Sequence, residues 1–240
     1  MSNCDLDMRT AMDRNKMECH RLALFGRMVM GVSHEVDNYL SVVIGFAELI
    51  QISGGGEKKT LDGVGKILNA GEKINTIIRH FSQYVRPHAP ARERFSPADA
   101  LRECLVFSRY DLGRHNVVLA LPESFPPGLL TADRRDFGLA LLALLFNGAE
   151  AMAPNGGTLR LDVFLRDGAW EFVVTDEGPG IPQENAQRIF EEGFTTKDGS
   201  IHFGMGLPLA RYLAADMGGT VSVANRPAGG CEAVLGIPRN

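Results

Sequence analysis

The chain has 240 residues, of which 45% are hydrophobic and 22% are charged, and its formal net charge at pH 7 is −4. This length allows two modest domains that each bury a core, and the composition is that of an ordinary globular protein. The negative charge, without any basic cluster, argues against a general nucleic-acid binder, which would carry a basic patch or stripe.

Cysteines and the N-terminus indicate the compartment. Cys4, Cys19, Cys104 and Cys231 show neither CxxC pairing nor the spacing of metal ligands. We expect reduced thiols, because disulfide frameworks are denser and accompany secretion. The polar N-terminus has no apolar signal core, and no run approaches the roughly 20 apolar residues that span a bilayer. These features predict a cytoplasmic protein without a membrane span.

The first part of the chain has the pattern of two long amphipathic helices. Residues 6–52 repeat apolar side chains in steps of three and four, which predicts one buried stripe from Phe25 to Ile50. Residues 53–56, Ser-Gly-Gly-Gly, predict a turn, and helical spacing resumes over 61–85. Such an antiparallel hairpin cannot bury both stripes alone, so we expect a homodimer that forms a four-helix bundle.

His34 lies away from that stripe. It follows Val32 by two residues, about 200° round a helix, so its imidazole should face solvent or a visiting domain. Glu35 adjoins it, and Asn38 lies one turn further on the same face. An imidazole, a carboxylate and an amide so placed form a plausible reaction centre, although an exposed histidine on an amphipathic helix gives the same pattern.

The second part of the chain has a mixed pattern. A linker with two prolines, residues 87–92, divides a helical domain, 1–88, from a second domain, 93–240. There Ser96-Pro97 opens a helix to about Arg109. Five strands with helices on one side predict an α+β fold with a two-layer, mostly antiparallel sandwich. The other expected elements are strands at 116–121, 158–165, 169–176, 220–225 and 231–237, and helices at 133–152, 183–190 and 206–217.

Four short segments of the second domain contain polar residues or glycines that need to be explained together. Asn147 interrupts an apolar helical run, and a buried amide is costly unless it is bonded or faces a ligand. Residues 176–180, Asp-Glu-Gly-Pro-Gly, end a strand. Residues 189–197 end in Thr-Thr-Lys, and 204–209 lead glycines into a helix N-terminus that favours phosphate. Singly, each piece also fits a core amide, a tight turn or a helix entry.

In this order the pieces resemble the N, G1, F and G2 boxes of the ATP-binding domain of sensor histidine kinases. Residues 33–40, Ser-His-Glu-Val-Asp-Asn-Tyr-Leu, resemble the H box of the same family, and the likeness extends from about residue 21 to 238. The resemblance implies a dimerisation and histidine phosphotransfer hairpin, followed by the Bergerat ATP-binding fold that is shared with gyrase and Hsp90.

The resemblance also implies ATP and Mg²⁺ as cofactors and a role for each site residue. His34 would accept the phosphoryl group, Asn147 would bind Mg²⁺, Asp176 would receive the adenine amino group, and Lys197 would lie near the phosphates. A mobile lid would run from Gly180 to Gly206. The remaining nucleotide-site residues implied are Gly178, Gly180, Gly204, Gly206 and Leu207.

On the His34 helix, Glu35 is placed to hold or deprotonate the imidazole. Asn38 resembles the family's phosphatase residue, which orients water against the phospho-aspartate of a receiver. Tyr39 stands where the family usually has proline, so we expect a straighter or differently bent helix and altered receiver contacts. Ala143 stands where gyrase and Hsp90 place a hydrolytic glutamate, which argues against an ATP-hydrolysing machine. His202 is either a lid contact to phosphate or a solvated loop residue.

These implications predict an ATP-dependent histidine autokinase that passes its phosphoryl group to an aspartate of a response regulator. A phosphotransfer protein with a decayed ATP site is the alternative, and the intact boxes favour the kinase. An anti-sigma-type serine kinase is disfavoured by the His34 hairpin. The first ~20 residues are too few for a sensor domain. Either a separate sensor protein acts on this chain, or the chain is part of a longer protein.

Overall fold

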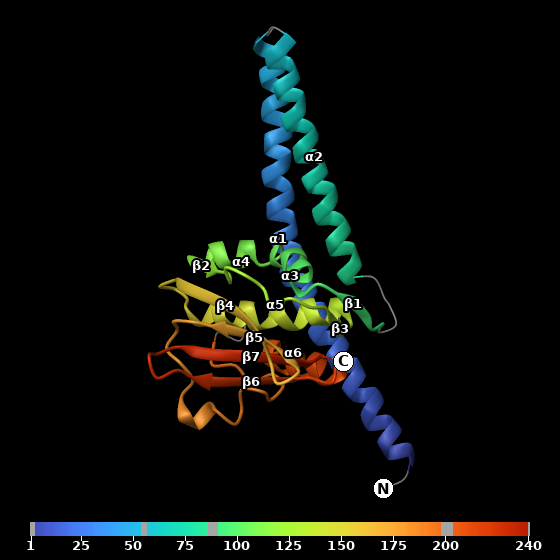
Figure 1. Ribbon diagram of the computed structural model, residues 1–240, viewed down its shortest axis with the longest axis vertical. Helices are drawn as coiled ribbons and strands as arrows, with labels where there is room; N and C mark the ends of the chain where they lie inside the picture. The colour runs from blue at the N-terminus through green and yellow to red at the C-terminus, as the bar shows by residue number, and fades with distance from the viewer. Residues whose placement is uncertain (1–2, 54–56, 86–90, 198–203, 240) are drawn as a thin grey trace.

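The computed structural model describes residues 3–53, 57–85, 91–197 and 204–239, with side-chain burial from Met17 onward (Figure 1). Helices α1 (Asn3–Ser53) and α2 (Glu57–Val85) form the expected antiparallel hairpin, which projects from an α/β region. Residues 54–56 of the expected turn and 86–90 at the linker lie outside the described residues. Within the described residues, no helix combines the length and the apolar character needed to cross a membrane.

The hairpin buries its apolar stripes only in part. Phe25 is 8% exposed, whereas Val29 and Leu40 of the same stripe are each 44% exposed. In α2, Leu61 and Leu68 are 65% and 63% exposed. The single chain thus leaves part of both stripes uncovered, as expected for a hairpin alone, because the α/β region covers only the lower end of α1.

The α/β region contains a five-stranded sheet with the order β2-β4-β5-β7-β6. The pair β2–β4 is parallel, and the other three pairs are antiparallel. This confirms the predicted mostly antiparallel sheet. The strands are β2 (Val117–Ala120), β4 (Gly157–Arg166), β5 (Ala169–Thr175), β6 (Thr220–Asn225) and β7 (Cys231–Pro238).

Two short strands were not predicted. Strands β1 (Glu93–Phe95) and β3 (Leu130–Ala132) pair antiparallel in a separate small sheet. Each has three residues, which is too short for an alternating pattern to show in the sequence.

The helices of this region also differ from expectation in two places. The helix predicted to reach Arg109 ends earlier, as α3 (Pro97–Leu105), and a separate α4 (Arg109–Arg114) follows. The chain turns between them because Phe107 is fully buried, with its ring against Tyr84 and Phe81. The helix predicted at 183–190 is only a 3₁₀ turn, η1 (Gln183–Asn185), since residues 182–184 and 186–188 are exposed and offer no packing face.

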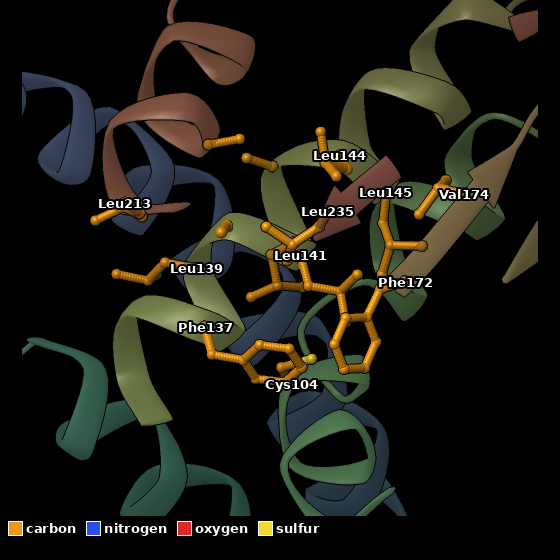
Figure 2. Packing of buried hydrophobic residues seen from close by; sticks show 14 of the residues in the cluster. Cys104, Phe137, Leu139, Leu141, Leu144, Leu145, Phe172, Val174, Leu213 and Leu235 are labelled. Carbon is orange, nitrogen blue, oxygen red and sulfur yellow. The ribbon is translucent and has the colours of Figure 1, made fainter. Parts of the chain in front are cut away.

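The core forms around α5 (Arg134–Ala151), which packs on the sheet beside α6 (Gly206–Asp216) and is covered on its other side by α1 and α3. Asp133 caps α5, since its carboxylate accepts from the backbone N–H groups of Arg135 and Asp136. Figure 2 shows α5 leucines packed between Phe172 and Val174 of β5 and Leu213 of α6. The α5 residues that are fully buried include Phe137, Leu139, Leu141, Leu142 and Leu145.

Candidate functional site

A cavity lies where α5, the end of β5 and the start of α6 meet, and α1 closes one side of it. Most of the residues singled out for nucleotide binding line this cavity, although they come from four separate stretches of sequence. Gly178 is outside the lining and lies directly beside Asp176. The singled-out residues that do line the cavity are Asn147, Asp176, Gly180, Lys197, Gly204, Gly206 and Leu207.

Asp176 follows β5 and is only 6% exposed. Its Oδ1 accepts hydrogen bonds from the backbone N–H groups of Gly178, at 2.8 Å, and Cys231, at 3.1 Å. Its Oδ2 makes no hydrogen bond with the described residues. The turn that provides the Gly178 donor needs glycine, since a Cβ at that position would lie 2.9 Å from the carbonyl oxygen of Ala151. One oxygen therefore anchors the carboxylate, and the other remains able to accept from a ligand.

Asn147 lies on the cavity side of α5. It is half-buried, and its side chain lines the cavity. Within the described chain this amide makes no hydrogen bond. An amide oxygen suits Mg²⁺, which protein sites often hold through one or two side chains together with substrate phosphates. The described residues contain no cluster of three or more His, Cys, Asp or Glu that could hold a metal.

Lys197 reaches the same side of α5 from the segment that follows η1. Its Nζ lies 2.8 Å from Oε2 of Glu150, one turn after Asn147. The other oxygen of this carboxylate, Oε1, pairs with Arg27 of α1. The sequence reasoning missed both partners. The position of Glu150, three residues after Asn147 on one helix face, could have indicated it. Arg27 precedes its partner Glu150 by 123 residues, so no local sequence pattern could indicate that the two form a pair.

The segment expected to be a lid is described up to Lys197 and again from Gly204. The N–H of Gly193 donates to the carbonyl of Gly204 at 3.2 Å, and Gly204 has φ +60°, a conformation that favours glycine. The N-cap side chain of α6, Met205, makes no capping hydrogen bond, so the first turn keeps N–H groups for an anion. His202, a suggested phosphate contact, lies outside the described residues.

Cys231 also lines the cavity, beside Asp176. Burial raises the pKa of its thiol to about 11, and the neighbouring Asp176 charge adds to the effect. The thiol is therefore neutral near pH 7.

His34 lies outside this cavity and is exposed, as expected. Its ring packs on Tyr110 of α4, with centroids 5.2 Å apart, and its Nδ1 lies 3.1 Å from Nδ2 of Asn38. Among the described residues, no hydrogen bond joins the Glu35 carboxylate to the His34 imidazole. Glu35 faces Arg109 instead, with Oε2 and Nη1 3.8 Å apart. The three residues thus share one surface, next to α4 rather than next to the cavity.

The two sites are separated along α1. Arg27 lines the cavity, and His34 follows it seven residues later, about 10 Å further along the helix axis. An ATP-binding type of α/β sandwich is thus joined to a hairpin that presents a histidine.

Comparison with known proteins agrees with this class. Residues 132–240 match the family described as "Histidine kinase-, DNA gyrase B-, and HSP90-like ATPase". Sporulation kinase D of Bacillus subtilis (strain 168) is 27% identical over 234 residues, which are 97% of this chain and 46% of that protein. The chain thus spans less than half the length of this relative. Residues 132–240 thus form a domain of this ATPase family, and the chain as a whole is similar to sensor histidine kinases.

Solved structures show the same fold. The catalytic domain of histidine kinase ThkA has a TM-score of 0.55 and 25% identity, covering 62% of this chain and 96% of that one. The complex of ThkA with response regulator protein TrrA has a TM-score of 0.52 and 22% identity, covering 98% of this chain and 67% of the other. The second likeness extends over the hairpin as well as the ATP-binding domain.

Proposed function

We propose that this chain is an ATP-dependent histidine kinase that phosphorylates itself on His34 and passes the phosphoryl group to an aspartate of a response regulator. The observation that carries the proposal is the meeting of Asn147, Asp176 and Lys197 at one cavity of an ATPase-family domain. An exposed histidine is presented on the hairpin of the same chain. The complex of ThkA with a response regulator supports the class of partner.

Each residue of the cavity has a task that its geometry suits. Oδ2 of Asp176 accepts from the adenine amino group, while Oδ1 stays anchored by two backbone donors. Asn147 would hold Mg²⁺, which supplies neutralisation of phosphate charge when bound. Lys197 and the first turn of α6 provide the remaining positive field, since phosphoryl transfer requires mainly positioning and electrostatic stabilisation.

In the chemical step an imidazole nitrogen of His34 attacks the γ-phosphorus of ATP. The N–P bond forms, the bond to the ADP oxygen breaks, and Glu35 takes the imidazole proton. In a second step the N–P bond breaks and an aspartate oxygen of the regulator takes the phosphoryl group. Because His34 faces α4 and not the cavity, the ATP-binding domain must move on the hairpin or act on a second copy.

The hairpin supports a homodimer as the working unit. Its exposed apolar side chains include Leu61 and Leu68, and a second hairpin would cover them in a four-helix bundle. The phosphatase role of Asn38, which would align water against a phosphorylated receiver, belongs to the same exposed surface.

Incubation with γ-labelled ATP and Mg²⁺ tests the kinase. We expect label on the protein that is lost in acid and kept in base, as a phosphohistidine would be. His34→Gln should abolish this label while leaving nucleotide affinity nearly unchanged, because the acceptor lies outside the cavity. Wild-type label in His34→Gln would refute the acceptor. A chain that gains label only from a phosphorylated receiver would be a phosphotransfer protein instead.

A further inference from the structure

Helix α1 provides a wall of the nucleotide cavity. Four of its residues line the cavity at helical spacing, and they come from outside the 132–240 domain. The cavity is therefore complete only when α1 is docked. These residues are His20, Ala23, Leu24 and Arg27.

Arg27 carries the charge on this wall. Its side chain extends to the residues around Lys197, where we place the phosphates. Its guanidinium pairs with Glu150 of α5, lies 3.1 Å from Oδ1 of Asp111 in α4, and sits 4.3 Å from the centre of the Phe146 ring. The side chains of both acids are nearly buried, with 8% exposure for Glu150 and 6% for Asp111. Three fixed contacts hold this side chain in one place.

Arg27 and Lys197 are two of the groups that interact with Glu150. Arg27 pairs with Oε1, while Lys197 lies 2.8 Å from Oε2. A buried carboxylate that loses its only cation is strongly unfavourable. A cation that stays with the carboxylate, as Arg27 does, therefore makes it easier for Lys197 to turn from Glu150 to a phosphate.

We propose that Arg27 is a positioning residue of the nucleotide site, which keeps Glu150 neutralised so that Lys197 can leave it and bind the phosphates. The proposal rests on the proposed function, because it needs Lys197 to bind phosphate. It makes tight binding of a triphosphate depend on the docking of α1, the helix that carries His34.

Calorimetry on the whole chain with Mg²⁺ tests this, using AMPPNP and ADP as ligands. In Arg27→Gln, Glu150 holds Lys197 more firmly, so the affinity for AMPPNP should fall about tenfold relative to that for ADP, which has fewer charges to neutralise. Arg21→Gln is the matched control. Arg21 also joins α1 to α5, at 2.9 Å from Asp136, but it does not line the cavity. This variant should keep the wild-type ratio of the two affinities.

A rescue variant separates the electrostatic role from a structural one. Adding Glu150→Gln to Arg27→Gln removes the charge that competes for Lys197, so the AMPPNP-to-ADP ratio should return toward wild type. An unchanged ratio in Arg27→Gln, or an equal change in Arg21→Gln, would overturn the role of Arg27. A double variant that fails to recover would overturn it as well. Wild-type chain that binds neither nucleotide would instead refute the proposed function itself.

Discussion

The two halves of α1 both carry many apolar residues and end in different environments. In residues 17–28, four apolar side chains are at most 8% exposed, because the ATP-binding domain covers them. In residues 40–52, the exposed apolar side chains range from 39% to 83%. The buried set is Met17, Leu24, Phe25 and Met28, and the exposed set is Leu40, Val42, Ile44, Leu49 and Ile52.

This difference shows that helical periodicity identifies an apolar face but not what covers it. The lower half is covered within the chain, and that contact brings Arg27 to the nucleotide cavity. The upper half needs a second hairpin, on our proposal, and presents its polar face for chemistry. Gly31 marks the boundary, since a Cβ there would lie 3.0 Å from the carbonyl oxygen of Phe107.

The chemistry assigned to the upper half gives the largest expected effect. Glu35→Ala should slow autophosphorylation by about 10²–10⁴-fold, the usual contribution of an acid–base partner. Asn38→Ala should spare autophosphorylation and slow dephosphorylation of the regulator, because it aligns water only in that reaction. Autophosphorylation rates and lifetimes of the regulator phosphate check both variants.

Asn38 contacts His34 directly, so the Asn38→Ala variant also tests whether this contact is needed for autophosphorylation. If Asn38→Ala impairs autophosphorylation as much as Glu35→Ala does, Asn38 orients the imidazole and the division of labour is wrong. It is also wrong if wild type shortens the regulator-phosphate lifetime and Asn38→Ala shortens it equally.

Packing in the two halves should differ by several kcal/mol. Met28 in the lower half is fully buried, and Leu49 in the upper half is 57% exposed. Met28→Ala should lower the free energy of unfolding by about 2–5 kcal/mol, as large-to-small core changes do. Leu49→Ala should change it by less than about 0.5 kcal/mol in a dilute, monomeric sample. Denaturant titrations measure both values, and an equal loss in the two variants would contradict the comparison.

The cavity beside the lower half should show smaller, ligand-specific losses. Asp176→Asn keeps an oxygen for the two backbone donors but places an amide donor toward the adenine amino group. It should weaken adenine-nucleotide binding by about 1–3 kcal/mol and reduce discrimination against guanine. Asn147→Ala should lose the Mg²⁺-dependent part of ATP binding. Calorimetry with and without Mg²⁺ tests both changes, and unchanged affinities in both would leave these residues with structural roles only.

The sequence predicted the hairpin, the five strands of the main sheet and the stretches that form the cavity, because each follows from local periodicity or from boxes in family order. It did not predict α4 as a separate helix, since burial of Phe107 decides where the chain turns. Nor did it predict the contacts that join α1 to the ATP-binding domain. Arg27 meets Asp111 and Glu150 across 84 and 123 residues, and no local pattern carries such pairings.

The last prediction compares the reactivity of two cysteines, one on the exposed side of lower α1 and one in the cavity wall. Cys19 is exposed on α1, whereas Cys231 is buried in the cavity wall. A thiol with a pKa of about 11 is thiolate in only about one molecule in 3,000 at pH 7.5. Iodoacetamide should therefore modify Cys19 first, and the rate at Cys231 should rise about 100-fold between pH 7.5 and 9.5, because its thiolate fraction rises tenfold per pH unit. Mass spectrometry of timed samples follows both sites. Modification of Cys231 as fast as Cys19 at pH 7.5 would mean that the cavity is open to solvent at this wall and that its carboxylate neighbour does not keep the thiol neutral.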